Sequence, residues 1–585
     1  MITNCKSGLR RLSSPIALIA LAAAFLAAAE PVKTPENDRL IQAARLWTTV
    51  KYFHPYLASR AIDWDKALID ALPRIRAAQS NDEYAAALQS LLDPVHGVIL
   101  RATEGSASAA SDAPAERTWI HHGFPPESGR NTGTFYSAFL VQPPGTSLAA
   151  TIIPLDGGLR AQINLFDHET AGVPLARSDS YPASPFPSTE YRILAAFKTW
   201  GVIHYFFAYR DLMDEDWDEV FASFLPRFIA AKDAREYHLA VAEMLTHTLD
   251  SHVTVTSDEP SGYFGRATAG LSLRLIEKRP VITEVLDENA KAAGLRPGDI
   301  VSKVDGESIA VRFNRIQDYV SGSTAQRRGY DSLERVLNGP EGSTATLLVL
   351  SPEGTAREVK IERRPIQEPA PRENAIRTLP GGIGYVDLTH LSDDRLPAIF
   401  EKFQNTRAII FDARGPVSPA ALAIASHLTD ANDVAGAIVT GPVTLSPDIV
   451  TTNTLTSTAS YFFIEKIPPV APKYQGKTVM LIDERTIGAA EHLGLWMEAA
   501  NNTAFIGTPS AGADGETSNF ILPGGITVTF SGQDVRHGNS GKLQRLGLQP
   551  NVLVAPTVTG IRHGRDEVLE KAIEYLSPPR RSQML

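Results

Sequence analysis

The sequence predicts a multidomain α/β protein, and three observations lead to this prediction. The chain has 585 residues, too many for one ordinary hydrophobic core. Its first half contains an internal repeat of mainly helical segments, and from about residue 379 strand and helix signals alternate. It is 43% apolar and 21% charged, a composition typical of soluble globular domains.

The N-terminus has the pattern of a signal peptide. Lys6, Arg10 and Arg11 precede an apolar run at residues 16–26, which ends in three alanines at 27–29. We expect residues 1–29 to be cleaved and the protein to be periplasmic or secreted; the alternative is an uncleaved membrane anchor. Cleavage would remove Cys5, the only cysteine, so the mature chain needs no disulfide.

The repeat is carried by aromatic residues at matching spacings. Trp47 begins W-T-T-V-K-Y-F-H-P-Y and Trp200 begins W-G-V-I-H-Y-F-F-A-Y; each run is followed by D-W-D, then L-P-R, then a tyrosine. We predict two helical repeats, at residues 30–104 and 188–261, with a small β module or linker at 105–187 between them. The aromatic residues are interpreted as core. Histidines close both copies, His96 in the first and His252 in the second.

Residues 262–365 contain several short motifs that are typical of turns. In A-A-G-L-R-P-G-D-I-V-S-K-V-D-G-E-S-I, the P-G-D and D-G pairs mark turns around an alternating strand. This segment resembles a PDZ domain. The resemblance implies that Gly270, Leu271 and Ser272 bind a peptide C-terminus by strand addition and backbone N–H capture. The alternative is a PDZ fold that serves only as a spacer.

A strand–turn–helix lies in the last third of the chain. Residues 478–482 are a strand candidate, Thr486 is a candidate N-cap, and residues 489–500 have helical spacing. Such a turn holds a side chain above backbone N–H groups, which suits a nucleophile and an oxyanion hole. Position 488 in this turn is glycine, which has no nucleophile. The Gly-Gly-x-Gly at 381–384 precedes a strand, so it is not a phosphate loop.

The motifs of residues 379–576 identify a family resemblance. G-Y-V-D-L, I-I-F-D-A-R-G, D-E-R-T-I-G-A-A-E and F-I-G-T-P-S-A-G-A-D-G, with the signal peptide and the PDZ-like segment, resemble the tail-specific, C-terminal-processing serine peptidases. The nearer branch is similar to the tricorn protease core and the retinoid-binding repeats. The resemblance implies a crotonase-like α/β core at 379–576, a tail at 577–585, and peptides or unfolded protein C-termini as partners.

The resemblance assigns the family's site residues to positions of this chain, but the position of the nucleophile holds glycine. Matching Thr486 and Glu491 to the family run T-x-S-x-A/S-E places the serine nucleophile at Gly488. One branch uses a lysine base, where this chain has alanine within residues 511–515; the tricorn-like branch uses a histidine, which matches His252. The resemblance also implies oxyanion donors at the backbone N–H groups of Gly415 and Ala489.

Several alternatives concern the missing nucleophile. Ser510 or Thr486 could replace the serine, although a turn residue and an N-cap are the simpler interpretations. Glu491 is a weaker catalytic candidate, and first-turn pairing with the helix dipole is its simpler interpretation. His492 is expected to face away from position 488. A serine at position 488 would be well tolerated provided that the backbone φ there is negative.

The remaining classes of function are judged from spacing and charge. Glu243, His247, Asp250 and His252 lack metal-ligand spacing, so we expect neither a metal nor another cofactor. The net charge is −10 and no basic block stands out, so we expect no nucleic acid; nor do we expect a stable membrane span after processing. The sequence therefore predicts an exported serine-peptidase relative with its nucleophile replaced by Gly488. The alternatives are a non-catalytic peptide-binding scaffold and, less favoured, a carrier of apolar ligands.

Overall fold

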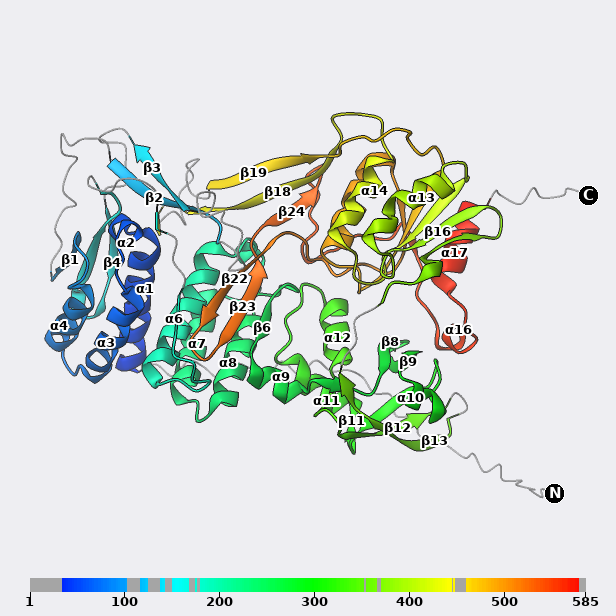
Figure 1. The fold of residues 1–585 in the computed structure, drawn as a ribbon. Coiled ribbons are helices and arrows are strands. Elements are labelled where there is room, and N and C mark those ends of the chain that lie inside the picture. Colours follow the sequence, from blue (N-terminus) through cyan, green and yellow to red (C-terminus); the bar gives the residue numbers. More distant parts are fainter. Residues whose placement is uncertain are drawn as a thin grey trace, which may run out of the picture.

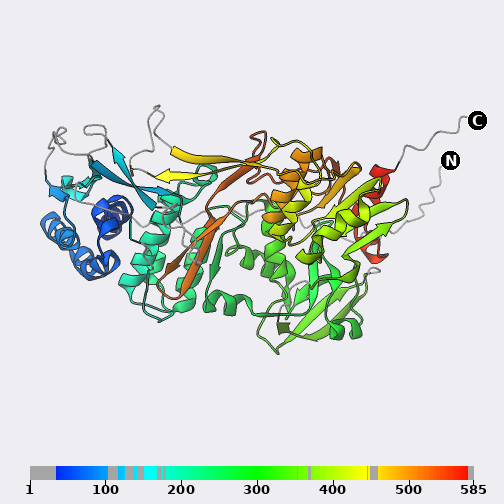
Figure 2. The same ribbon diagram turned by 45° about the horizontal axis from the view of Figure 1, so that its top comes forward.

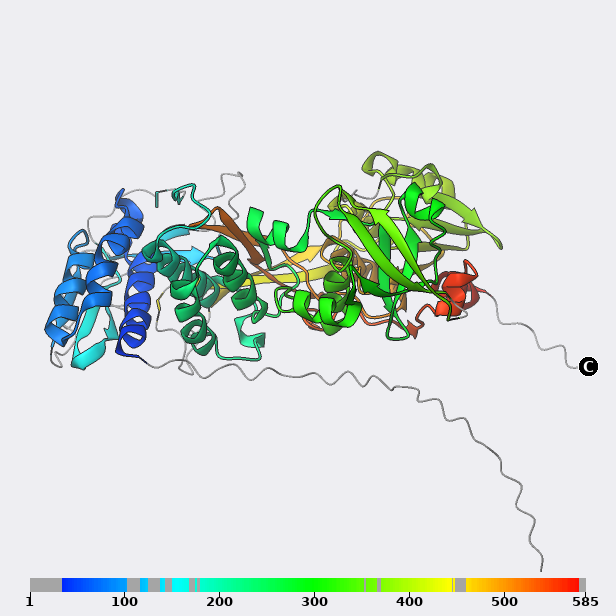
Figure 3. The same ribbon diagram turned by 90° about the horizontal axis from the view of Figure 1, so that it is seen from below.

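The computed structural model describes residues 34–102, 116–124, 137–142, 150–167, 174–175, 179–351, 354–365, 370–444, 446–447 and 459–577. The predicted signal peptide and the last eight residues lie outside these ranges. The molecule is elongated, with helical modules at one end and an α/β core and a middle domain at the other (Figures 1 and 3). Within the described ranges, no helix combines the length and the apolar character that a membrane span requires.

The first module contains the first helical repeat and the strands that complete it. Its helices are α1 (Pro35–Phe53), α2 (Pro55–Ser59), α3 (Trp64–Ala77) and α4 (Asn81–Leu92), and its strands are β1 (Val98–Arg101), β4 (Ala150–Pro154) and β5 (Arg160–Asn164). The side chains of Thr34, Asp63 and Ser80 cap α1, α3 and α4 by accepting backbone N–H bonds. The strands form a sheet in the order β1-β5-β4. The hairpin β4/β5, which completes this module, follows the module's helices in sequence.

The second module repeats this plan with strands from elsewhere in the chain. Its own elements are α6 (Thr189–Phe206), α7 (Trp217–Ala230), α8 (Ala234–Thr246) and β6 (Thr254–Thr256). The hairpin that completes its sheet, in the order β6-β23-β22, is β22 (Thr517–Leu522) and β23 (Ile526–Ser531), which reaches over from the core (Figure 2). The second module therefore depends on residues more than 250 positions away.

The two modules meet through equivalent residues. Tyr52 packs on Phe206 with ring centroids 5.1 Å apart, and Phe53 packs on Tyr205 at 4.8 Å. Tyr52 and Tyr205 occupy the same place in the repeat, as do Phe53 and Phe206, so the two contacts are reciprocal. Reciprocal contacts are the property of an interface with two-fold symmetry. The sequence repeat is thus a repeat of the fold, arranged around a local pseudo-two-fold axis.

A further sheet joins the modules to the core. It has the strand order β19-β18-β2-β3, built from β2 (Glu116–His122), β3 (Ser137–Gln142), β18 (Ala435–Thr444) and β19 (Ala459–Lys466), and β24 (Asp534–His537) also pairs with β18. The hairpins β2/β3 and β18/β19 meet where His122 pairs with Val443. The strands of the predicted 105–187 segment are therefore divided between two sheets, each of which includes strands from outside that segment.

The middle domain lies beside the second module and the core. Its elements are α9 (Asp258–Phe264), β7 (Ala267–Thr268), β8 (Leu271–Ile276), β9 (Arg279–Val285), α10 (Glu288–Ala292), β10 (Ile300–Val304), β11 (Glu307–Ser308), α11 (Ile309–Gln317), α12 (Ala325–Glu334), β12 (Thr344–Leu350), β13 (Ala356–Glu362) and β14 (Arg364–Pro365). The sheet order β13-β12-β10-β9-β8 makes β8 an edge strand. Asp305 and Gly306, both with positive φ, form the predicted turn after β10.

The core is a parallel sheet with one antiparallel edge strand and helices on both faces. Its elements are β15 (Ile376–Leu379), β16 (Ile383–Asp387), α13 (Leu396–Phe403), β17 (Ala408–Asp412), α14 (Ala423–Ser426), β20 (Lys477–Ile482), α15 (Ala489–Asn501), β21 (Ala504–Gly507), β25 (Val552–Leu553), α16 (Val558–Arg562) and α17 (Glu567–Leu576). The strand order is β15-β16-β17-β20-β21-β25. The multidomain α/β class is confirmed.

Alternation along the central strands explains the layers of the core. Phe411 and Met480 pack with α13, α14 and α15, whereas Ile410 and Val479 pack with α17. A strand buried on both faces must be apolar at nearly every position, and β17 and β20 are. The carboxyl ends of these two parallel neighbours meet at one edge of the sheet, and the turn that contains Gly488 follows β20 there.

Candidate active site

Gly488 stands at the start of α15, at the turn the sequence indicated. Its φ is +56° and its ψ is −121°, a conformation that residues with a Cβ rarely adopt. The condition of a negative φ at this position is therefore not met, and a serine here would be strained. Strain of this kind is also a property of nucleophile turns between a strand and a helix.

Thr486 is not the N-cap of α15, and the prediction of that role was wrong. The helix begins at Ala489, so Gly488 takes the cap position and provides no side-chain bond. The buried Thr486 hydroxyl instead donates to the carbonyl oxygen of Ala413 at 2.8 Å and accepts from the backbone N–H of Asp483 at 3.1 Å. These bonds tie the turn after β20 to the turn after β17, and they leave Thr486 poorly placed to act as a nucleophile.

His252 lies beside Gly488, as the resemblance implied. A Cβ built on Gly488 would lie 3.5 Å from His252 Nε2, and it has no other described heavy atom within 4 Å apart from its chain neighbours. His252 comes from the segment between α8 and β6. That segment reaches the core because β6 pairs with β23, with Val255 opposite Val528. The fold thus brings together two residues that are 236 positions apart in the sequence.

A buried chain of hydrogen bonds orients His252. Its Nδ1 lies 3.0 Å from the Ser531 hydroxyl, which donates to Asp250 Oδ1 at 3.0 Å. The backbone N–H groups of Ser531 and His252 also donate to the Asp250 carboxylate, at 2.9 and 3.2 Å. Because the Ser531 proton is directed at Asp250, its oxygen accepts from Nδ1–H. This arrangement leaves Nε2 as the unprotonated nitrogen, facing residue 488.

Sequence reasoning did not find this role of Asp250 and Ser531. Asp250 was considered only as a poorly spaced metal ligand, and Ser531 ends a strand with no distinguishing pattern. The D-S-H run that contains both Asp250 and His252 was a signal that could have suggested an acid close to the base. No sequence pattern marks Ser531, because its position is set by the pairing of β23 with β6.

The two predicted oxyanion donors are backbone N–H groups near the same sheet edge. Ala413, two residues before Gly415, donates its N–H to Leu481 O at 3.1 Å, which holds the turn after β17 against β20. Within the described ranges, neither the Gly415 nor the Ala489 N–H has a hydrogen-bond acceptor. Both groups therefore stay predicted donors that are free to bind a carbonyl oxygen.

Arg414 anchors the turn that carries Gly415. Its guanidinium donates to Asp412 at 2.9 Å through Nε and to Asp566, at the N-cap of α17, at 2.9 Å through one terminal nitrogen. Tyr385 donates its hydroxyl to Asp412 at 2.7 Å. Although burial disfavours its charge, the Arg414 guanidinium beside it holds the pKa of Asp412 below its usual range. The turn is thus fixed by a paired buried charge rather than by apolar packing alone.

Glu491 and Ser510 hold a neighbouring loop in place. The fully buried Glu491 carboxylate accepts from the Ser510 hydroxyl and from the N–H groups of Gly512 and Ala513, at 2.7 and 2.9 Å. Burial raises the pKa of Glu491 to about 8. Ala513, in the stretch where the lysine branch has its base, accepts the Gly488 N–H at 2.9 Å.

These hydrogen bonds argue against Ser510 as a replacement nucleophile. The Ser510 hydroxyl is fully buried, donates to Glu491 and accepts from the Leu548 N–H at 2.6 Å. A serine with its hydroxyl committed in this way is not available to attack a substrate carbonyl. The geometry gives both Ser510 and Glu491 a positioning role.

His492 is engaged away from the turn. Its Nδ1 lies 3.0 Å from Asp514 and its Nε2 lies 2.6 Å from Glu465 of β19. Burial opposes the charge, but the hydrogen bonds to the two carboxylates raise the pKa of His492 to about 10. His492 therefore fastens the β18/β19 hairpin to α15.

The structure does not gather the acidic and histidine residues weighed as metal ligands. Glu243 pairs with Arg227 at 2.8 Å, and His247 lies 3.1 Å from Glu215. In the described part of the chain, no group of three or more His, Cys, Asp or Glu side chains is arranged to hold a metal ion.

The predicted peptide-binding residues lie at the start of β8. Gly270 has a φ of +66° and its carbonyl accepts from the N–H groups of Leu286 and Asp287; Leu271 and Ser272 pair with β9. The middle domain touches the site from here, because Arg274 of β8 donates to Glu484, in the Gly488 turn, at 2.8 and 2.9 Å.

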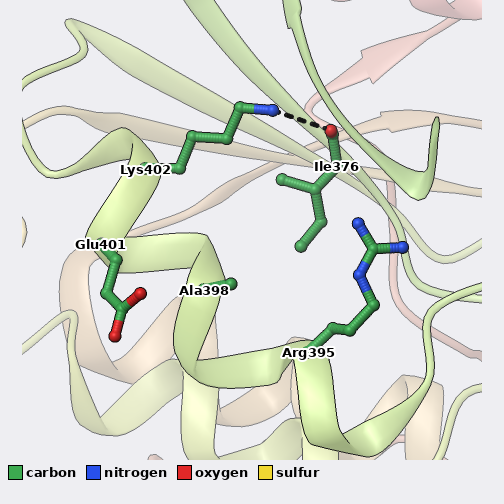
Figure 4. A pocket seen from close by; sticks show the side chains of 5 residues that line it. All are labelled: Ile376, Arg395, Ala398, Glu401 and Lys402. Atoms are coloured by element: carbon green, nitrogen blue, oxygen red, sulfur yellow. Dashed lines mark hydrogen bonds between the residues drawn. The ribbon is translucent and has the colours of Figure 1, made fainter. Parts of the chain in front are cut away.

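A pocket is present elsewhere in the core. It has a volume of about 330 Å³ and is lined by Ile376, Arg395, Ala398, Glu401 and Lys402, between β15 and α13 (Figure 4). Lys402 Nζ donates to the Ile376 carbonyl at 3.0 Å across it. None of the predicted site residues lines this pocket, so the candidate active site rests on side-chain geometry.

Comparison with known proteins finds a matching family and a similar fold. Residues 382–554 match the family described as peptidase family S41. Among solved structures, mature CPAF complexed with lactacystin is similar to 66% of this chain and 97% of its own, with 15% identity and a TM-score of 0.51. The photosystem II D1 C-terminal processing protease is similar over 62% and 93%, with 16% identity and a TM-score of 0.39. The similarity to CPAF shows a shared fold. No curated protein matches the chain.

Proposed function

We propose that the protein, whose residues 382–554 match the model of peptidase family S41, is an exported member of that family that binds polypeptide substrates where the second module meets the core and forms no acyl-enzyme at residue 488. The family match and the multidomain α/β fold are the premises. Export rests on the signal-peptide pattern of residues 1–29.

One observation carries the proposal. His252, oriented by the buried Asp250 through Ser531, faces Gly488, where a serine peptidase would carry its nucleophile and this chain has no side chain. Covalent catalysis needs a side chain that can be acylated, which glycine cannot provide. Substrate binding does not depend on that side chain, because it uses backbone groups and the surrounding surface.

A binding experiment tests this function. Titration of the protein without residues 1–29 against fluorescent unfolded peptides should give saturable binding. Mass spectrometry of the same mixtures should show no acylated protein. Absence of binding to every unfolded peptide, including peptides with free apolar C-termini, would contradict the proposal.

A second candidate function is capture of peptide C-termini by the middle domain without any chemistry. The edge position of β8, with Gly270 in a positive-φ conformation at its start, favours it. Peptides with a free apolar C-terminus should bind, and amidated versions should bind more weakly by tenfold or more. Equal affinity of the two forms would remove carboxylate capture by Gly270, Leu271 and Ser272.

Export is tested separately. N-terminal sequencing of protein from the cell envelope should begin near Glu30. Soluble cytoplasmic protein that retains Met1 would contradict it.

A further inference from the structure

We propose that the wild-type site hydrolyses carboxylic esters of peptide-like acids in a single step, with water as the nucleophile and His252 as the general base. The inference rests on the proposed function, because the acyl part of the ester must bind where a polypeptide binds. It goes beyond that function by assigning an activity to the site that lacks a serine.

The space at residue 488 suits a water molecule. A serine would fill it with a methylene and a hydroxyl group, whereas glycine leaves His252 Nε2 as the one described heavy atom beyond its chain neighbours within 4 Å of the Cβ position. A bound water occupies about 30 Å³. Nε2 offers an acceptor for one of its protons, while the Ala489 N–H stays free for the carbonyl oxygen of the substrate.

The protonation pattern of His252 supports the role of base. Nδ1–H is held by Ser531, whose own proton is directed at the buried Asp250. As His252 takes a proton on Nε2, the positive charge that develops is stabilised through Ser531 by the Asp250 carboxylate. The whole relay is therefore present without a serine at position 488. We infer that Ser531 and Asp250 are positioning residues.

The step balances without any further reagent. The water oxygen attacks the ester carbonyl carbon while one water proton passes to His252 Nε2, and the carbonyl oxygen becomes an oxyanion at the free N–H groups of Gly415 and Ala489. The C–O bond to the alcohol then breaks, and the imidazolium proton passes to the departing alkoxide. The products are a carboxylic acid and an alcohol, and His252 returns to its neutral form.

Esters suit this site better than peptide bonds do. Water is a weaker nucleophile than an activated serine, and no acyl intermediate divides the reaction into two easier steps. A phenolate leaves without prior protonation, whereas an amine must be protonated as it departs. We therefore expect ester hydrolysis at a measurable rate and peptide hydrolysis far below it.

The test uses N-acetylalanine p-nitrophenyl ester with the full mature chain. Wild type should accelerate hydrolysis about 10³-fold or more over buffer, because serine hydrolases that lack a triad member keep about that level through oxyanion donors and binding, to which His252 adds base catalysis here. His252→Ala should lower that rate about 10²-fold or more, since general base catalysis contributes about 10² to 10⁴. The matched control His96→Ala, at the exposed histidine that closes the first repeat, should leave the rate unchanged.

Two further readouts separate water from a hidden nucleophile. Wild type should release p-nitrophenol without an initial burst and should remain unacylated by mass spectrometry. Ser531→Ala should lower the rate, and Ser531→Thr, which keeps the hydroxyl, should restore it. A burst with a stable acyl adduct, or a wild-type rate equal to that of His252→Ala, would overturn the inference. If unfolded peptides still bind in the latter case, the inference alone fails and the proposed function stands.

Discussion

The two helical modules share one plan but differ in what completes them. In the first module, hairpin β4/β5 follows the helices in sequence and closes the sheet on β1. In the second, hairpin β22/β23 comes from the core and closes the sheet on β6. His252 reaches Gly488 because of this borrowed hairpin, while the equivalent end of the first module has no core to meet. The candidate site therefore depends on which hairpin completes the sheet of a module, rather than on the helices that both modules share.

Because the two helical modules share the same framework, a substitution in one can be compared directly with the equivalent substitution in the other. Trp64 donates its indole N–H to Trp47 O at 3.0 Å, and Trp217 donates to Trp200 O at 3.0 Å. The tryptophan pairs thus perform the same structural task in both copies. Differences between the copies can then be tested by paired substitutions at equivalent positions.

The largest difference is expected between Asp250→Ala and Asp93→Ala. Asp250 is fully buried and accepts from two N–H groups and one hydroxyl, whereas Asp93 is exposed at the end of α4. Leaving several buried donors unpaired should reduce the free energy of unfolding by about 3 kcal/mol or more. Asp93→Ala should change it by about 0.5 kcal/mol or less. Urea denaturation measures both, and equal effects would contradict the asymmetry between the modules.

The interface between the modules should be sensitive to a single methyl group. A Cβ on Gly201 would lie 2.4 Å from Thr48 Cγ2, its equivalent in the first repeat. Gly201→Ala should therefore lower the free energy of unfolding by about 1 to 3 kcal/mol. The added change Thr48→Ser, which removes Cγ2, should recover part of that loss.

Gly262→Ala is the matched control for that substitution. Gly262 is an exposed glycine in α9 with no described atom within 4 Å of its Cβ position. Alanine there should be neutral or slightly stabilising, by about 0.5–1 kcal/mol. A Gly201→Ala variant as stable as this control would show that the two modules do not pack closely at the pseudo-two-fold axis.

The third expected effect is on pH dependence. His492 fastens the β18/β19 hairpin, which belongs to the sheet that joins the modules to the core, to α15. Because the pKa of His492 is raised to about 10, its contribution to stability is full below the unfolded value of about 6.5 and is lost as pH rises to about 10. The stability difference between wild type and His492→Gln should therefore shrink across this range in thermal denaturation. A constant difference from pH 6 to pH 10 would contradict the charged state of His492.

The sequence predicted local elements better than it predicted their partners. Strand 408–412 and the α15 region at 489–500 were found because buried apolar runs and helical spacing are local signals. The family motif led to Gly488 and His252, which lie side by side in the structure, and their roles as nucleophile position and base stay predictions. Ser531 and the division of residues 105–187 between two sheets could not be predicted, because strand pairing over hundreds of residues leaves no local pattern. Thr486 was misassigned because a threonine three residues before the start of a helix resembles a cap in sequence.

Fluorophosphonate labelling of wild type beside Gly488→Ser tests most directly the claim that only the nucleophile is missing. Wild type should remain unlabelled, because its one well-placed base faces glycine. In Gly488→Ser the new hydroxyl should lie within reach of His252 Nε2, so this variant should label at residue 488 and cleave unfolded peptides slowly, even though the φ of +56° strains a serine there. The double variant Gly488→Ser, His252→Ala should lose both properties. Strong labelling of wild type at any serine, or a folded Gly488→Ser that stays unlabelled, would contradict the account.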